Sequence, residues 1–209
     1  MTEIRRIIIG KTVMPESWIV KDGRKDMVYP IVFSVFLLKT KTRLLLADAG
    51  CETMTGFEMT DFIGTTEALK REGISPSDIT DVIITHAHHD HIECVKYFPG
   101  ARIHIQREEY EAGKRYIPDG FAVCPFDEEA ALGEGITVKR IGGQSVGSSV
   151  IEIETAGKPI VICGDECYTS YNLTHRVPTA TSCDPARSRY FIDRYAGGDY
   201  TCLLSHEVT

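Results

Sequence analysis

Four of the chain's seven histidines stand with an aspartate in six consecutive positions, 86 to 91, within the stretch ITHAHHDHIE. Imidazole and carboxylate side chains are ligands that suit zinc, iron or manganese. The run directly follows DVIIT, which has the apolar character of a buried strand. A solvated histidine-rich loop would not need that strand, so the stretch predicts one half of a metal site.

The spacing within this half suits two neighbouring metal positions. Residues two apart at the end of a strand point to the same side, so His86 and His88 can direct their rings at one point. A helix is expected from about residue 89 to 97. Asp90 and His91, in its first turn, would face a second point nearby.

Two further residues of ligand type stand at the ends of apolar strands. Asp165 closes PIVICGD, and His206 follows the apolar residues of TCLLSHE. Either residue alone would be an ordinary polar residue at a strand end. Each repeats the layout of the first motif, however, and together the three stretches predict that Asp165 and His206 supply the other half of the site.

The elements that must position these residues are runs of strands with helices between them. Strands are predicted over 4–9, 17–20, 30–38, 42–48, 81–85, 101–106, 136–142, 148–155, 159–165 and 200–207. Helices are predicted over 65–72, 89–97, 107–114 and 184–198. Both halves of the chain have their own strands and helices, which predicts an α/β fold of two packed sheets with helices outside. No repeat or linker interrupts the chain, so a single domain over 1–209 is expected.

The composition narrows the class of protein. The 209 residues carry a formal net charge of −7, which argues against binding to nucleic acid or to an anionic membrane. No apolar run reaches the roughly 18 residues of a membrane-spanning helix. The apolar stretch near the N-terminus is too short for a signal peptide. A cytoplasmic protein with its seven cysteines mostly reduced and buried is therefore expected.

These motifs resemble those of the metallo-β-lactamase superfamily. HxHxDH at 86–91, Asp-x-Gly in LLLADAG, the Asp of CGD and the late histidine carry the resemblance, from about residue 30 to 207. It implies a four-layer αββα sandwich, with two mixed sheets, outer helices and a binuclear metal site at one sheet edge. One ion would bind His86, His88 and a third residue, the other would bind Asp90, His91 and His206, and Asp165 would bridge them. Asp48 would orient a ligand imidazole.

The third ligand of the first ion departs from the family pattern. That ligand is normally the histidine of a Gly-His-Thr-x-Gly-Ser motif, and the matching stretch GGQSVGSS has Gln144 there. An amide oxygen binds zinc more weakly than imidazole does. We therefore expect two divalent ions, zinc before iron or manganese, with the first position binding more weakly. A second departure is Glu93 and Cys94, where relatives usually have glycines.

Within the superfamily the chain resembles the N-acyl homoserine lactonases, the enzymes of quorum quenching. ARIHIQREEYEAG, GDECYT and RVPTATSCDPARS carry this resemblance. It implies a hydrolase that opens a small-molecule lactone, or cleaves a related carboxylic ester, by attack of a metal-bound hydroxide. Tyr168, three residues after Asp165, would hydrogen-bond the substrate carbonyl. Asp90 would relay a proton to the leaving alkoxide.

Two other functions stay open. A thioesterase or phosphodiesterase of the same superfamily would use the same kind of metal site. A degenerate metal- or ligand-binding protein without catalysis is the other alternative, and Gln144 is the feature that favours it.

Overall fold

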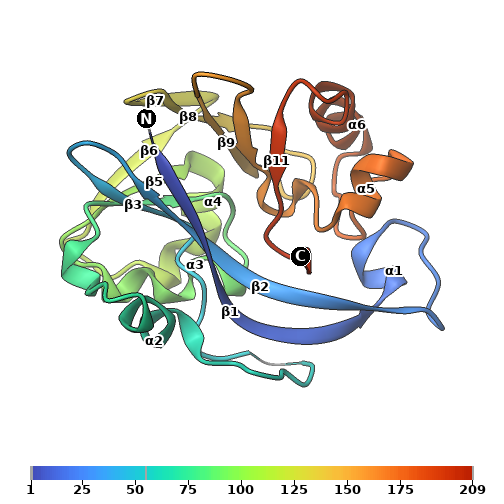
Figure 1. The fold of residues 1–209 in the computed structure, drawn as a ribbon, viewed down its shortest axis with the longest axis horizontal. Coiled ribbons are helices and arrows are strands. Elements are labelled where there is room, and N and C mark those ends of the chain that lie inside the picture. Colours follow the sequence, from blue (N-terminus) through green and yellow to red (C-terminus); the bar gives the residue numbers. More distant parts are fainter. Residues whose placement is uncertain (1, 55, 209) are drawn as a thin grey trace. The chain divides into compact units, whose positions relative to one another are not determined.

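The computed structural model describes residues 2–54 and 56–208, which fall into two compact units. Unit 1 contains the chain up to Thr12 and residues 32–126, and unit 2 contains residues 13–31 and the chain from Asp127 onward. The boundary crosses the two long strands β1 and β2 (Figure 1). The expected single domain over 1–209 stays a prediction.

The first sheet has six strands in the order β1-β2-β3-β4-β5-β6. Their bounds are β1 Glu3–Pro15, β2 Val28–Lys39, β3 Leu44–Ala47, β4 Asp81–Ile84, β5 Arg102–Gln106 and β6 Ala122–Phe126. β2 and β3 are antiparallel, and β3 to β6 are parallel, so the sheet is mixed. The carboxyl ends of the parallel strands lie at one edge, and β4 delivers residues 85–91 to that edge.

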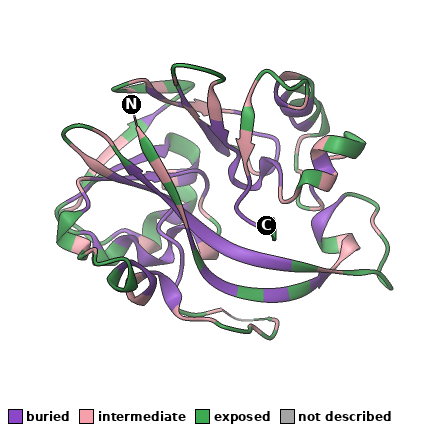
Figure 2. Cartoon of the chain, viewed as in Figure 1, coloured by how far each residue is buried: buried purple, intermediate pink, exposed green. Residues whose placement is uncertain are grey.

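The burial of these strands follows their residue pattern (Figure 2). All four residues of β4 are buried, and β2 is buried without interruption from Ile31 to Leu38. Continuous apolar runs of this kind are typical of strands that are covered on both faces. The edge strand β1 alternates over much of its length between buried and exposed residues, as expected where one face meets solvent.

The helices of unit 1 are α2 Gly64–Arg71, α3 His89–Ile92 and α4 Arg107–Gly113. α2 ends before Gly73, whose φ of +75° suits glycine and stops the helix where the sequence predicts. α3 continues as a 3-10 helix over Glu93–Tyr97, so the helix predicted over 89–97 is present as two short segments. α4 packs against β5 and β6.

The sheet of unit 2 has five strands in the order β11-β10-β9-β8-β7. Their bounds are β7 Glu129–Gly133, β8 Ile136–Arg140, β9 Ser149–Ile153, β10 Ile160–Ile162 and β11 Thr201–Leu203. β10 and β11 are parallel and the other pairs are antiparallel, so this sheet is also mixed. The two mixed sheets with their helices confirm the predicted α/β class.

The helices of unit 2 are α1 Glu16–Ile19, α5 Ser170–His175 and α6 Pro185–Tyr195. α6 buries Phe191, Ile192 and Tyr195 against residues of the sheet. The Asp184 side chain caps it by accepting from the backbone nitrogens of Ala186 (2.9 Å) and Arg187 (3.1 Å), as the sequence predicts. No described helix is long and apolar enough to cross a membrane.

One predicted strand is wrong, because residues 17–20 lie mostly in α1. The Glu16 carboxylate accepts from the backbone nitrogen of Arg24 (2.8 Å) and from the hydroxyl of Tyr29 (3.1 Å). These bonds draw the chain into a compact turn between β1 and β2. Contacts made at a distance in sequence thus override the strand propensity of SWIV.

A buried carboxylate holds the amino end of β4. The Asp81 carboxylate accepts from His104 Nε2 (2.8 Å), Arg102 Nη2 (2.9 Å) and Thr80 Oγ1 (2.8 Å), and Asp81 is fully buried. Burial raises the pKa of the Asp81 carboxyl, but the hydrogen bonds from His104, Thr80 and Arg102 outweigh it and lower the pKa below its ordinary value.

We expect Asp81→Asn to lower the free energy of unfolding by about 2–3 kcal/mol at pH 7, because hydrogen bonds to a charged group are lost. The folded-state pKa lies below the unfolded-state value, so this stabilisation is complete above the unfolded pKa and is lost as pH falls through the folded pKa. In urea unfolding, the difference between the two proteins should shrink below about pH 5. A difference that is independent of pH would contradict the prediction.

The matched control is Asp61→Asn. Asp61 is exposed and pairs with Lys11 at 3.0 Å on the surface. Surface pairs of this kind contribute about 1 kcal/mol or less.

Candidate metal centre

Three histidine rings form a cluster at the carboxyl end of β4. The centroid of the His86 ring lies 4.6 Å from that of His88 and 4.1 Å from that of His91. One ring nitrogen of His86 lies within 4.8 Å of one of His91, and both residues are buried. Buried imidazole nitrogens this close together are the type of donor set that zinc takes.

The Asp48 carboxylate orients the His91 ring of this cluster. Asp48 is buried, and its Oδ2 accepts a hydrogen bond from His91 Nδ1 at 2.8 Å. Its Oδ1 accepts from the backbone nitrogen (2.8 Å) and the hydroxyl (2.9 Å) of Thr85. With its proton on Nδ1, the His91 ring can present Nε2 to a cation. The contact between Asp48 and His91 is the one that the resemblance implies.

Asp90 lies beside Nε2 of His91. Its Oδ2 is 3.3 Å from His91 Nε2, and its side chain is only 19% exposed. Asp90 and His91 are adjacent in the first turn of α3, as the sequence predicts. A carboxylate and an imidazole nitrogen at this separation can bind one cation together.

A glutamate that sequence reasoning missed holds the peptide between the first two histidines. Glu109 Oε2 accepts from the backbone nitrogen of Ala87 at 2.7 Å, and Glu109 is buried in α4. The sequence gives little indication of this role for Glu109, because an acidic residue in the first turn of a helix is ordinarily exposed and interacts with the helix dipole.

The departure at Glu93 has a structural explanation. Its Oε2 accepts from the backbone nitrogen of Glu52 at 2.6 Å, and its Oε1 accepts from Lys96. Burial raises the pKa of the Glu93 carboxyl, but these two hydrogen bonds outweigh it and the pKa is lowered. A glycine at position 93 would have no side chain to accept from the backbone nitrogen of Glu52. Glu93 therefore fixes the segment that follows Asp48, which a glycine at this position could not do.

Asp165 and His206, the two strand-end ligands predicted in unit 2, lie in contact with each other. Asp165 lies in a 3-10 helix, Gly164–Glu166, just after β10, and His206 follows the parallel strand β11. His206 Nε2 donates to Asp165 Oδ1 at 3.0 Å, and both side chains are buried. The Tyr168 ring lies against His206, with centroids 5.0 Å apart. Parallel neighbouring strands thus bring the two strand-end residues together.

Gln144 lies buried in the loop after β8. Its backbone nitrogen donates to Glu166 Oε1 at 3.1 Å, and that of Gly143 donates to the same oxygen at 2.9 Å. Its side-chain Nε2 donates to Thr181 Oγ1 at 3.3 Å. Sequence reasoning did not single out Glu166 or Thr181, because neither stands in a ligand motif.

The predicted ligands therefore form two groups. His86, His88, Asp90 and His91 lie together in unit 1. Asp165 and His206 lie together in unit 2, which also contains Gln144 and Tyr168. That the two groups form one site stays a prediction.

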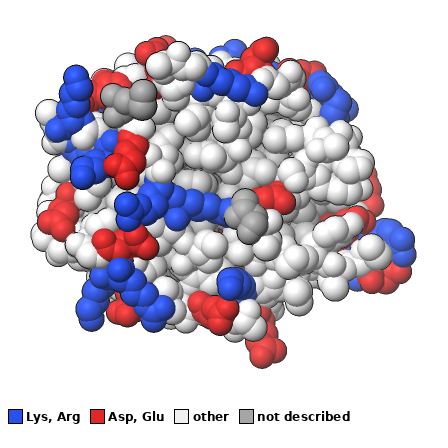
Figure 3. Space-filling model, in the orientation of Figure 1, with Lys and Arg blue, Asp and Glu red and all other residues white. Residues whose placement is uncertain are grey.

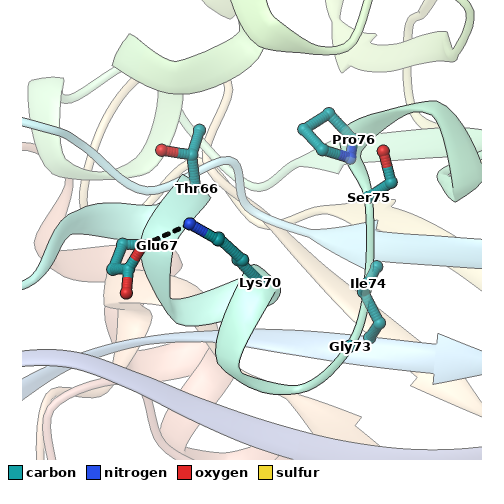
Figure 4. Close-up of a pocket in the computed structure, with 7 residues that line it drawn as sticks. All are labelled: Thr66, Glu67, Lys70, Gly73, Ile74, Ser75 and Pro76. Carbon is teal, nitrogen blue, oxygen red and sulfur yellow. Dashed lines mark ion pairs between the residues drawn. The ribbon is translucent and has the colours of Figure 1, made fainter.

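A depression in unit 1 is unrelated to these groups. It lies between α2 and the loop that follows, and its lining residues are Thr66, Glu67, Lys70, Gly73, Ile74, Ser75 and Pro76 (Figure 4). Lys70 Nζ lies 3.8 Å from Glu67 Oε2 on the α2 side of the depression. On the face drawn in Figure 3, basic side chains lie next to acidic ones. The expected lack of a nucleic-acid partner stays a prediction.

The comparisons with known proteins agree with the ligand motifs. The model of the metallo-beta-lactamase superfamily matches residues 30–185. The N-acyl homoserine lactonase AiiB of Agrobacterium fabrum is 26% identical over 129 residues, which are 51% of this chain and 47% of that protein. Metallo-beta-lactamase domain-containing protein 1 of Homo sapiens is 36% identical over 101 residues, 47% of this chain and 36% of that protein. The matched segment thus spans less than half the length of either relative.

A solved structure shares the fold over nearly the whole chain. It is an N-acyl homoserine lactone hydrolase with the product N-hexanoyl-L-homoserine bound at its catalytic metal centre. The TM-score is 0.84 and the identity 21%, over 98% of this chain and 93% of that chain. At this identity the likeness concerns the fold alone.

Proposed function

The chain belongs to the metallo-β-lactamase superfamily, and on that basis we propose that it is a metal-dependent hydrolase that opens a lactone or cleaves a related carboxylic ester. The observation that carries the proposal is the cluster of the buried His86 and His91 with the exposed His88, in which Asp48 accepts a hydrogen bond from Nδ1 of His91. Buried, oriented imidazoles with a carboxylate partner are the usual construction of a metal site.

Two divalent ions, zinc before iron or manganese, fit the donors of the two groups. One ion would be held by His86, His88 and Gln144, the other by Asp90, His91 and His206, with Asp165 shared between them. His206 Nε2 lies 3.0 Å from Asp165 Oδ1, which supports a role for both residues in holding the same ion. Nitrogen and carboxylate donors are the set that zinc prefers.

In the proposed reaction the ions, when bound, would activate a water and polarise the substrate carbonyl. The Asp90 carboxylate takes up the proton released by the attacking water and passes it to the leaving alkoxide oxygen. The Tyr168 hydroxyl donates a hydrogen bond to the carbonyl oxygen as negative charge develops there. Asp48 keeps the proton of His91 on Nδ1 throughout, which preserves its ligand nitrogen.

A substrate panel tests this function. The protein would be stripped of metal, reloaded with zinc, manganese or iron(II), and assayed with acyl lactones, carboxylic esters, thioesters and phosphodiesters. We expect metal-dependent turnover of the lactone or ester class. Greater turnover of thioesters or phosphodiesters would move the protein to the alternative hydrolase class.

The second candidate, a non-catalytic binding protein, is favoured only by Gln144 in place of a histidine. The same panel separates it from the hydrolase. Retention of two ions without turnover of any class would support the binding protein and contradict the hydrolase.

We expect Gln144→His to raise the affinity of the more weakly held ion by at least about 10-fold, since changing even the hydrogen-bond partner of a ligand alters metal affinity about 10- to 100-fold. Imidazole replaces a neutral amide oxygen as the donor. Metal analysis after dialysis measures the effect, with Gln144→Ala as the matched control that has no donor. Retention should rise from alanine to glutamine to histidine, and equal retention by all three proteins would show that residue 144 is not a ligand.

A further inference from the structure

One threonine hydroxyl in unit 2 joins two residues that the proposed function uses. Thr181 Oγ1 accepts from Gln144 Nε2 and also lies 3.3 Å from the Tyr168 hydroxyl. We propose that Thr181 is a positioning residue, which sets the atom that Gln144 offers to a metal ion and the direction of the Tyr168 proton. This inference rests on the proposed function and deepens it.

The direction of the Gln144 amide follows from the donors and acceptors involved. An amide nitrogen only donates hydrogen bonds, and an amide oxygen only accepts them. Because Nε2 is directed at Thr181, Oε1 lies at the other end of the planar amide group. Oε1 is the only side-chain atom of Gln144 that can bind a cation. A rotated amide would present Nε2 and its protons to the ion instead.

Thr181 is itself held by the backbone of the Gln144 loop. The backbone nitrogens of Cys183 and Asp184 both donate to the carbonyl of Gly143, at 2.8 and 3.1 Å. A Cβ on Gly143 would come within 2.8 Å of the backbone nitrogen of Ser188, so this close approach requires glycine. The segment that carries Thr181 and the loop that carries Gln144 are therefore fixed to each other.

The Thr181 hydroxyl also influences the direction of the Tyr168 proton. The Thr181 oxygen accepts from Gln144 Nε2, and the single proton of the hydroxyl is then available to donate to Tyr168 Oη. In that arrangement the proton of Tyr168 is directed away from Thr181, toward an acceptor such as a substrate carbonyl oxygen. Thr181 thus links the ligand amide to the hydroxyl that would bind the developing negative charge.

The test compares Thr181→Val, which removes the hydroxyl at nearly constant shape, with Thr181→Ser, which keeps it. Thr181 is exposed, so both variants should fold, and Thr181→Ala is a second way to remove the hydroxyl. The readouts are cobalt(II) affinity by chelator competition, the visible spectrum of the cobalt(II) protein, and kcat at saturating metal. We expect the valine variant to bind the weaker ion about 10-fold less tightly, and the serine variant to stay within about 3-fold of wild type.

Two background variants separate the two roles. In Gln144→Ala, Thr181→Val should no longer change cobalt(II) affinity or the spectrum, since no amide is left to orient. In Tyr168→Phe it should still weaken cobalt(II) binding but should lower kcat no further. An additive effect on cobalt(II) affinity in Gln144→Ala, together with an additive effect on kcat in Tyr168→Phe, would overturn the proposal.

Two further outcomes distinguish this inference from the proposed function. If wild type binds two ions and the valine and alanine variants bind them equally well, Thr181 has no positioning role and the hydrolase proposal is unaffected. If wild type binds no cobalt(II), both proposals are wrong.

Discussion

Asp165→Asn is expected to weaken metal binding by at least about 100-fold, with a matching loss of metal-dependent turnover at limiting metal. Losing a partner of a ligand already costs about 10- to 100-fold in metal affinity, and Asp165 would be a ligand to both ions. Asparagine keeps the size of the side chain but removes the charge that holds two cations close together. Metal analysis after dialysis and turnover as a function of added zinc measure the effect.

Asp119→Asn is the matched control, because Asp119 is exposed and lies outside both ligand groups. It should retain the metal content and turnover of wild type. If Asp165→Asn retains two ions as tightly as the control does, Asp165 does not bridge them.

Tyr168→Phe is expected to lower kcat by about 10- to 1,000-fold with unchanged metal content and little change in KM, because the lost hydrogen bond is strongest in the transition state. The control is Tyr171→Phe in the next helix, α5. Its ring stacks on His175 at 3.8 Å, and no role in the reaction is proposed for its hydroxyl. The control should stay within about 2-fold of wild type. An equal effect of the two substitutions on kcat would remove Tyr168 from the mechanism.

The predicted ligands His86, Asp165 and His206 share one property: each follows a strand by two or three residues. β4 precedes His86, β10 precedes Asp165 and β11 precedes His206. Strand burial is readable from apolar runs, and the carboxyl ends of parallel strands are where ligand residues gather. The fold class followed from the same runs. The cap of α6 was also predictable, because Asp184 and Pro185 act on their immediate neighbours.

The features that were missed depend on contacts between distant parts of the chain or on edge positions. Glu109 reaches Ala87, and Glu166 reaches Gly143. β6 contains Pro125 and β7 reads EAALG, so neither shows a strand pattern. Both lie at the edge of their sheet, where a proline is tolerated and pairing with a single neighbour suffices. Such features require the fold to be known first.

The short strand β4 is fixed at both of its ends. Asp81 is bonded to His104 and Arg102 at the amino end, and Asp48 holds Thr85 and His91 just beyond the carboxyl end. Immobilising a side chain when a ligand binds costs about 0.5–1.5 kcal/mol in conformational entropy. For His91 and its neighbour His86 this loss already occurs when unit 1 folds. A cation that arrives afterwards meets imidazoles that have little freedom left to lose, so its binding free energy is reduced less by their ordering.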